Sequence, residues 1–429
     1  MADETQKVLD LIDKEAAAKL LIDLVNISSP TGEEGEIGKY LAGRYESAGL
    51  KTTLQEADQD RFNAVGVVEG DGTGLSLMFD GHMDVSFTGR EKVGAKGGFG
   101  LLPTVSSGAK AVVEGGRIYG LGATNMKGGV TAFTLAAESI KKAGVKLRGD
   151  LTVAGVIGEI IMAPVDEFKE AKLRGYTRGT QFLVTHGFGA DMAVVAEPTG
   201  SIVRLGHFGP QWVKISTYGV TANTVYSGEV VSPIDRMLRI IQALKDWTPR
   251  YQEKIYNRFP HMKTKPVVRI SAINGGTPWR LARPAGMCSI YLDIRTKQSA
   301  AELKRDIVQM LKGVKESAQS QGDPEFDFDV EFYLTQPGAE VEPDHLLVTS
   351  IRAAHRTVHS ADAEDVYGAI DSDASVLTHY GIPAINYGPR PRDASTRTGG
   401  REYQNIDDVV NVARVFALLA LDICNRPAT

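Results

Sequence analysis

The sequence lacks several features that would indicate particular classes of protein. Its 429 residues include only two cysteines, which share no CxxC spacing, so a disulfide framework is excluded and a reducing compartment is indicated. No apolar run approaches the ~20 residues of a membrane span, and the charged N-terminal segment is unlike a secretory signal. The net charge of −5 and the absence of a basic run give no indication of nucleic-acid binding. We expect a cytoplasmic protein that binds neither membranes nor nucleic acids.

The composition is that of an ordinary globular protein, with 42% hydrophobic and 24% charged residues. A chain of this length is too long for one compact core. We therefore expect two domains, one of them interrupted in sequence by the other. The predicted boundaries are residues 1–203 for the first part of the large domain, 204–318 for the inserted domain and 319–429 for the second part of the large domain.

The large domain has the sequence pattern of a layered α/β protein. Residues 4–50 are predicted to form two helices. Short apolar runs follow at residues 63–70, 75–85, 150–159 and 191–199. They are rich in Val, Ile and Met and mostly do not alternate, which is typical of strands buried on both faces of a sheet. A predicted helix at residues 126–144 lies between two of them.

The sequence pattern changes near residue 205. Residues 207–227 alternate like a half-exposed antiparallel strand, and further strands are predicted at 265–276 and 286–296. Amphipathic helices are predicted at 232–247 and 299–318. Two helices on an antiparallel sheet indicate a small α+β domain.

Polar residues follow the apolar strands of the large domain at the point where each strand ends. His82 and Asp84 end one run, Glu159 ends another and Glu197 ends a third, while Asn125 lies in a glycine-rich turn before a helix. Open α/β sheets place their functional sites at such strand ends. Histidine with carboxylate oxygens suits Zn, Mn or Fe, and a further carboxylate suits a general base. Each residue alone could equally be a solvated strand end.

Three successive segments carry a resemblance to a known family. GHMDV at 81–85, GLGATNMKGG at 120–129 and AEPT at 196–199 resemble signatures of the metallohydrolases that include acetylornithine deacetylase, succinyl-diaminopimelate desuccinylase and glutamate carboxypeptidase. Residues 371–389 resemble a later stretch of that family. The resemblance covers nearly the whole chain. It implies a metallohydrolase catalytic domain with a mixed sheet and an inserted α+β domain that acts as a dimerisation lid, so we expect a homodimer.

The resemblance also assigns roles to the polar residues. It implies that His82 and Glu197 bind a metal ion, that Asp84 orients His82 through the other ring nitrogen, and that Glu159 is the general base. Asn125 stands where the family has an aspartate that bridges two metal ions.

Two further departures concern the second ion. Ile160 and Thr398 stand where the family has ligands that bind the second ion alone. Two divalent cations close together need several anionic ligands. We therefore expect one divalent transition metal ion per chain (Mn, Zn or Fe), bound by His82, Glu197 and Asn125.

The expected substrate contacts come partly from the resemblance and partly from the chemistry of the side chains. Asn223 stands where the lid of the family carries a histidine that stabilises an oxyanion, which argues against ordinary amide hydrolysis. Arg280 and Arg397 are candidates for binding a substrate carboxylate, although both could belong to solvated loops. His207 and Thr398 are further candidate substrate contacts, while His186, His355, His359 and His379 are expected to be structural or solvated.

Three functions remain open at this point. With the ligands of the second metal ion replaced, the chain resembles a member of the family that replaces the amino group of a nitroaromatic acid with hydroxyl. This resemblance implies a small aromatic amino-carboxylate as substrate. The alternatives are an N-acyl amino acid deacylase or dipeptidase, and a relative that binds a ligand without catalysis. The retained Glu159 argues against the third, since a binding protein gains little from a buried base.

Overall fold

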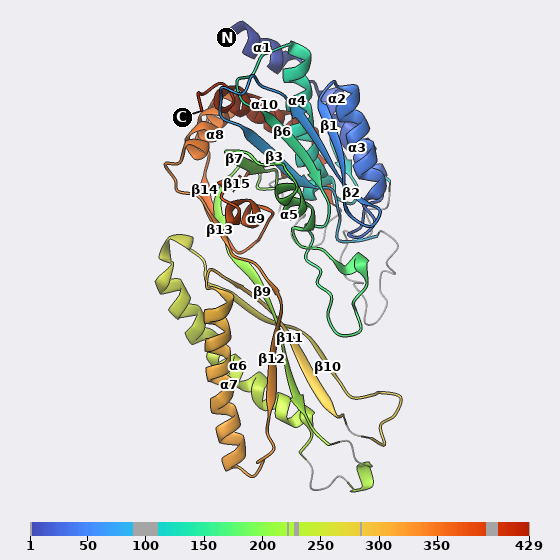
Figure 1. Cartoon of the computed structure of the whole chain (residues 1–429), viewed down its shortest axis with the longest axis vertical. Helices are drawn as coiled ribbons and strands as arrows, with labels where there is room; N and C mark the ends of the chain where they lie inside the picture. Colours follow the sequence, from blue (N-terminus) through green and yellow to red (C-terminus); the bar gives the residue numbers. More distant parts are fainter. Residues whose placement is uncertain are drawn as a thin grey trace. The chain divides into compact units, whose positions relative to one another are not determined.

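The computed structural model describes residues 2–88, 110–220, 223–226, 231–283, 285–391 and 402–428, and it divides into two compact units (Figure 1). Within these residues the first unit extends to Gly206 and resumes in Ala339–Val366 and from Ser372 onward. The second unit comprises His207–Gly338 and Tyr367–Asp371. It therefore continues past the predicted boundary at residue 318, because residues 328–335 pair with residues 211–217 in its sheet.

The first unit is built on a mixed sheet. Its strand order is β1-β2-β6-β3-β7-β15-β8-β13, with β14 beside β8. The strands are β1 Lys51–Asp58, β2 Arg61–Val68, β3 Leu77–His82, β6 Leu151–Val156, β7 Met192–Val195, β8 Val203–His207, β13 Ala339–Glu340, β14 Asp365–Gly368 and β15 Ala384–Asn386. The central strands β6, β3, β7 and β15 are parallel, and β3, β6, β7 and β15 are completely buried. Their unalternating apolar sequences therefore fit burial on both faces.

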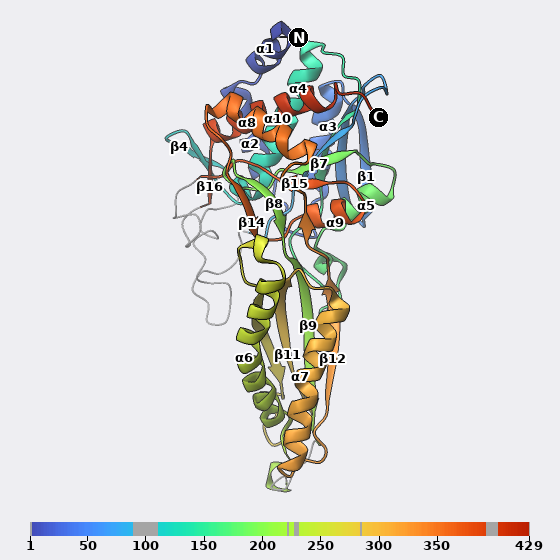
Figure 2. The ribbon, with the colours of Figure 1, turned by 90° about the vertical axis from the view of Figure 1, so that its left-hand side faces the viewer.

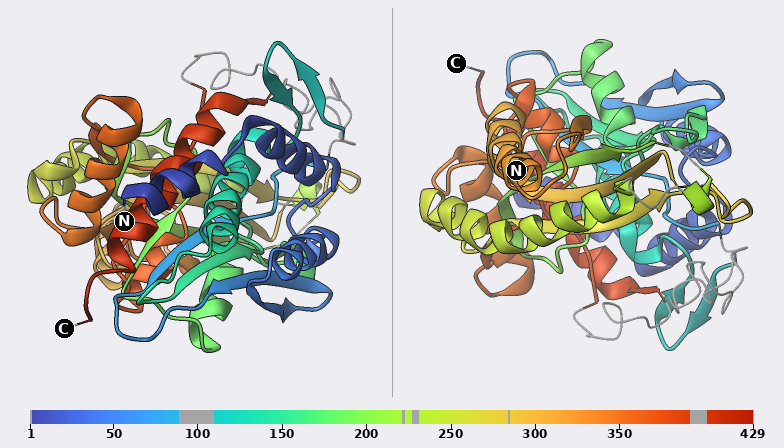
Figure 3. Two further views of the ribbon diagram at one scale, coloured as in Figure 1. Left: turned by 90° about the horizontal axis from the view of Figure 1, so that it is seen from above. Right: turned by 90° about the horizontal axis from the view of Figure 1, so that it is seen from below.

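Helices cover both faces of this sheet (Figure 3). They are α1 Ala2–Asp10, α2 Lys14–Asn26, α3 Gly35–Ser47, α4 Gly128–Ala143, α5 Arg178–Thr185, α8 Leu346–His359, α9 Ala374–His379 and α10 Ile406–Ile423. Phe79 of β3 packs on Phe416 of α10 with ring centroids 4.6 Å apart. The next residue, Asp80, accepts a hydrogen bond from Thr180 of α5. Because side chains alternate along a strand, α10 and α5 lie on opposite faces.

The N-terminal region differs from the prediction of two helices. It forms three, because the first ends at Asp10 and a new helix begins after Asp13. The Asp13 side chain accepts a hydrogen bond from the Ala16 amide at 2.8 Å, which caps α2. A small separate sheet completes the unit, with the strands β16 Tyr403–Asn405, β5 Arg117–Tyr119 and β4 Val112–Glu114.

The second unit has the predicted α+β organisation. Its antiparallel sheet has the order β10-β11-β9-β12, with two helices packed on one face (Figure 2). The elements are β9 Gly209–Tyr218, β10 Val267–Gly275, β11 Met287–Thr296, β12 Phe328–Thr335, α6 Pro233–Arg258 and α7 Ala300–Ser320, with short turns η4 Thr224–Tyr226 and η5 Pro260–Met262. The fold class predicted from the sequence is thus confirmed. No helix within the described ranges is both long and apolar enough to cross a membrane.

Candidate metal centre

The candidate centre lies where three parallel strands of the first unit end. His82 is the last residue of β3, Glu159 follows β6, and Glu197 follows β7. Since β3 pairs with both β6 and β7, the carboxyl ends of these strands are neighbours. Asn125 lies in η2 (Ala123–Lys127), the turn that leads into α4.

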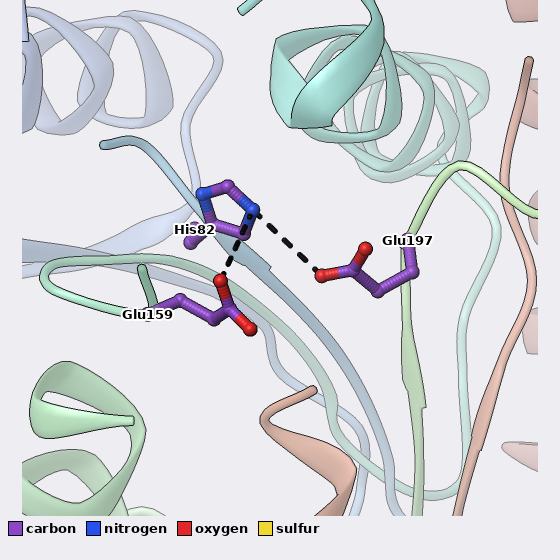
Figure 4. Close-up of side chains that lie close together, drawn as sticks. All are labelled: His82, Glu159 and Glu197. Atoms are coloured by element: carbon purple, nitrogen blue, oxygen red, sulfur yellow. Dashed lines mark ion pairs between the residues drawn. The ribbon is translucent and has the colours of Figure 1, made fainter. Parts of the chain in front are cut away.

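Four polar side chains converge at this point, and Figure 4 shows three of them, His82, Glu159 and Glu197. The Nε2 atom of His82 lies 3.6 Å from Oε2 of Glu159 and 3.7 Å from Oε1 of Glu197. The same nitrogen lies 3.3 Å from Oδ1 of Asn125. One ligand atom from each of His82, Glu159 and Glu197 lies within 4.8 Å of the others, and all three residues are buried. The structure therefore brings together four of the five residues that were predicted to carry the chemistry.

The fifth residue, Asp84, lies on the other side of the histidine ring. Nδ1 of His82 is 2.9 Å from the backbone oxygen of Asp84 and 3.5 Å from its Oδ1. The carboxylate also accepts hydrogen bonds from the amides of Glu159 and Ile160, each at 3.1 Å, and from Thr31 Oγ1 at 2.8 Å. Asp84 thus contacts both the imidazole and the backbone that carries Glu159.

A carboxylate that was not predicted as a site residue supports the turn of Asn125. Glu402 accepts hydrogen bonds from the amides of Gly122, Thr124 and Asn125 at 3.0, 3.0 and 3.1 Å. Three N–H donors on one half-buried carboxylate fix the position of the turn. The only sequence signal was the place of Glu402, four residues after Thr398.

The centre is strongly anionic for a buried site. Burial opposes protonation of His82, but the hydrogen bond and charge of Asp84, with the charges of Glu197 and Asp373, together raise the pKa of His82 to about 9. Burial also raises the pKa of Asp80, two residues before His82 on β3, to about 7 despite the hydrogen bond from Thr180. Burial and the neighbouring Asp80 hold the pKa of Asp373 well above its usual range. Charged carboxylates so close together in a buried site repel one another and are stabilised by protons or by a cation.

Comparison with known proteins identifies the family. Residues 78–422 match the model of peptidase family M20/M25/M40. The chain belongs to the M20 family. This confirms the family resemblance drawn from the three sequence motifs.

Two curated relatives resemble the chain over most of its length. N-formyl-4-amino-5-aminomethyl-2-methylpyrimidine deformylase of Bacillus subtilis is 24% identical over 433 residues, covering 95% of this chain and 94% of the relative. Succinyl-diaminopimelate desuccinylase of Gluconacetobacter diazotrophicus is 26% identical over 353 residues, covering 81% and 79%.

Solved structures show the same fold. A tripeptidase from Staphylococcus aureus has a TM-score of 0.72 at 17% identity and covers 97% of this chain and 100% of its own. The dipeptidase Dug1p of Saccharomyces cerevisiae has a TM-score of 0.69 at 14% identity and covers both chains completely.

The donor set fits the divalent metal ion that M20 enzymes use. One imidazole nitrogen and the carboxylate oxygens of two glutamates are suitable ligands for Zn, Mn or Fe, and the amide oxygen of Asn125 adds a neutral donor beside them. As an M20 member with this cluster, the chain is a metal-dependent hydrolase acting on C–N bonds.

The other predicted site residues are placed as follows. Thr398 and Arg397 lie outside the described residues. Asn223 belongs to the second unit and accepts a hydrogen bond from the Val225 amide at 3.1 Å. His207 is buried in that unit, with Nδ1 2.9 Å from the Phe208 oxygen, and Arg280 is exposed there. Their roles in substrate binding stay predictions.

Proposed function

We propose that this M20 hydrolase replaces the amino group of an aryl amine with hydroxyl, using one divalent metal ion held by His82, Asn125 and Glu197. The proposed reaction converts 5-nitroanthranilate and water into 5-nitrosalicylate and ammonia. When bound, the ion would supply Lewis acidity and lower the pKa of water.

The position of Glu159 supports a role as the general base in the proposed reaction. Its carboxylate lies 3.6 Å from His82 Nε2 and its amide is fixed by Asp84, so the base is held beside the ligand cluster. Glu159 accepts a proton from water as the C–O bond forms at the ring carbon. The proton passes to the nitrogen as the C–N bond breaks, and ammonia leaves. The nitro group takes up the charge that develops in the ring, so no oxyanion-stabilising histidine is required.

The observation that carries the one-ion proposal is the shortage of further ligands. Of eight histidines in the sequence, His82 is the one at this cluster. The others in the first unit have different surroundings: His186 stacks on Phe182, His345 caps α8, His355 contacts Tyr387, His359 stacks on His355 and His379 is exposed. Ile160, which follows Glu159, offers no donor in its side chain. Among the residues described, the one group of histidine and carboxylate side chains that could hold a metal ion is His82, Glu159 and Glu197, which supports a single ion.

Amide hydrolysis is the second candidate, because the relatives favour it. The deformylase and the desuccinylase, which match most of this chain, are named for removing an acyl group from nitrogen. The same base and metal site would serve that reaction, with the proton delivered to the amine that leaves. The two candidates differ in the carbon attacked, an aromatic ring carbon or an acyl carbon.

One set of assays separates these candidates. The purified protein with added Mn or Zn is incubated with 5-nitroanthranilate, with N-succinyl-diaminopimelate and with an N-formyl arylmethylamine. Ammonia, succinate and formate are quantified, and Glu159→Gln is the catalytic control. Ammonia from the first substrate, lost in the variant, supports the proposal. Succinate or formate without ammonia supports amide hydrolysis.

The remaining alternative is binding without catalysis. It predicts that none of the three substrates is turned over, while 5-nitroanthranilate still binds to both the wild type and Glu159→Gln in calorimetry. This result would overturn both enzymatic candidates.

We also propose that the second unit forms the contact of a homodimer. Its strand β10 is a sheet edge nine residues long that is mostly exposed, with Ile270 38% and Ile273 58% exposed. Long exposed edge strands readily pair with another chain. Light scattering on the wild type and on Ile273→Lys tests this: we expect a dimer and a weakened dimer, and a monomeric wild type would overturn it.

A further inference from the structure

A loop carries the candidate base Glu159 near its start and leads into α5. This segment, residues 158–176, is referred to below as the 158–176 loop. Its two ends are joined by backbone hydrogen bonds, from Tyr176 N to Ile160 O and from Gly175 N to Met162 O, both 3.1 Å long. A Cβ on Gly175 would lie 2.1 Å from the Ile160 oxygen, so the close approach of the two ends requires glycine there. The position of Glu159 therefore depends on how this loop is anchored.

A buried ion pair lies next to the two ends of the 158–176 loop. Arg61, at the start of β2, donates from Nε to Glu34 Oε2 and from Nη2 to Glu34 Oε1, each at 2.7 Å. The side chains are 3% and 0% exposed. Glu34 is the N-cap residue of α3, yet its side chain makes no capping hydrogen bond. The Glu34 carboxylate binds Arg61 instead of capping the helix.

This ion pair contacts both ends of the 158–176 loop. Glu34 Oε1 accepts a hydrogen bond from the Gly158 amide at 3.1 Å, and Arg61 Nη1 donates to the Arg174 oxygen at 2.8 Å. Gly158 has φ +61°, and a Cβ there would lie 2.7 Å from Arg61 Nη2. The backbone just before Glu159 is therefore packed directly on the guanidinium group.

The same network includes the carboxylate that contacts His82. Gly32 N donates to Glu34 Oε2 at 3.0 Å, and the neighbouring Thr31 hydroxyl donates to Asp84 Oδ2 at 2.8 Å. Glu34 and Asp84 thus accept hydrogen bonds from three successive amides, those of residues 158–160. Charge-assisted hydrogen bonds in a buried network fix backbone positions more firmly than neutral ones.

We propose that Glu34 and Arg61 are positioning residues for Glu159, acting as a clamp on the two ends of the 158–176 loop. The clamp fixes the backbone from which the base projects, while contributing no ligand to the metal ion. The catalytic part of this inference rests on the role of Glu159 in the proposed function. The structural part, that the ion pair anchors the loop, is testable without any activity.

The test variant is the double substitution Glu34→Gln and Arg61→Met. Removing both charges avoids leaving one charged partner buried and unpaired, which is the most damaging outcome for folding. Asp58 also lies 3.6 Å from Arg61 and loses this neighbour in the variant. It keeps Arg174 and Arg178 at 3.7 and 3.8 Å as cationic neighbours.

A matched control exists in the same unit. Arg44 of α3 and Glu138 of α4 form another two-point ion pair, with distances of 2.6 and 2.8 Å and exposures of 25% and 19%. The double substitution Arg44→Met and Glu138→Gln removes the same charges away from the loop. A change shared by both double variants reports general stability, and a change specific to the clamp variant reports positioning.

Hydrogen exchange measured by mass spectrometry is the readout that needs no substrate. In the clamp variant, the amides of residues 158–160 should exchange about tenfold faster or more, because local opening becomes easier, while β3 and α4 keep the exchange rates of the wild type. The Mn affinity should stay close to that of the wild type. In the control, the 158–160 amides should be unchanged. Unchanged exchange of these amides in the clamp variant would overturn the inference, whatever the substrate proves to be.

Kinetics then test the link to Glu159. With the substrate that the wild type turns over, kcat should fall about 10- to 100-fold with KM nearly constant, because the base is misplaced. In the Glu159→Gln background the clamp substitutions should lower kcat no further, since residues acting through one group are not additive. An equal loss of kcat with and without Glu159 would show that the ion pair does not act through the base. If no substrate is turned over, the proposed function fails while the exchange result still decides the clamp.

Discussion

Substitution of Asn125 by aspartate tests the metal centre with almost no change in shape. The amide oxygen of Asn125 lies 3.3 Å from His82 Nε2, and the turn that carries it is held through the backbone by Glu402. Asn125→Asp therefore places a negative charge at the ligand cluster without moving the chain. The substitution also restores the charge that the family has at this position.

The magnitude follows from two opposing effects. At an effective dielectric constant of about 20, two unit charges 4 Å apart attract by about 4 kcal/mol, and a divalent ion would double this. Burying another carboxylate costs several kcal/mol, so most of the gain is offset. We expect a net gain of about 1.5–3 kcal/mol in metal binding, which is about 10- to 100-fold in the dissociation constant.

Calorimetric titration with Mn or Zn at neutral pH, together with native mass spectrometry, measures affinity and stoichiometry. Asn26→Asp is the matched control, because Asn26 Oδ1 accepts a hydrogen bond from the Ala111 amide outside the centre, and the net charge changes equally. We expect tighter binding for Asn125→Asp alone, with one ion per chain in all three proteins, since Ile160 still provides no second ligand set. Two tightly held ions in the wild type, or no difference between Asn125→Asp and Asn26→Asp, would refute the reasoning.

Three further predictions concern the same centre. Glu159→Gln should lower kcat about 100-fold or more and keep Mn affinity near the wild-type value; an affinity loss as large as that of Glu197→Gln would make Glu159 a ligand. Asp84→Asn should lower the free energy of unfolding by about 1–3 kcal/mol, because an amide nitrogen replaces one of the two oxygens that accept backbone N–H groups. It should also weaken metal binding about 10- to 100-fold. Chemical denaturation and calorimetry measure the two effects, and unchanged values would contradict the role of Asp84. Because the pKa of His82 is raised to about 9, the ring is protonated at neutral pH without metal and must lose its proton before it binds the ion, so metal affinity should rise with pH up to about 9. Calorimetry in buffers of different ionisation enthalpy should detect the release of this proton at pH 7. The absence of proton release would show that His82 is already neutral.

The position of the candidate centre could be predicted because it depends on local pattern. Apolar runs that do not alternate predict buried parallel strands, and polar residues at their ends predict a site at one edge of the sheet. His82, Glu159 and Glu197 follow this rule, and their ligand atoms lie within 4.8 Å of one another. The confirmed fold class rests on the same patterns together with the family resemblance.

Contacts between residues distant in sequence could not be predicted in this way. Glu34 reaches Gly158 across 124 positions, and Glu402 reaches Asn125 across 277. A glutamate at a helix start has the same local pattern whether it caps the helix or crosses to another element, because the choice depends on what tertiary structure places nearby. The division of the units likewise depends on the pairing of β12 with β9, which periodicity alone does not specify.

The sequence position of Asp80 is a further indication of the candidate centre. It is a charged residue inside an apolar strand whose residues are all buried, and such a residue is costly unless something compensates its charge. In the structure its neighbour Asp373 is also fully buried, and none of the described residues donates a hydrogen bond to either oxygen of Asp373. With Asp84, Glu159 and Glu197 nearby, the single imidazole cannot balance these carboxyl groups. Protons must occupy part of the cluster when no cation is bound, and they become easier to lose when a divalent ion binds. The buried charge of this strand is thus an argument for a cation-binding centre that is independent of the family motifs.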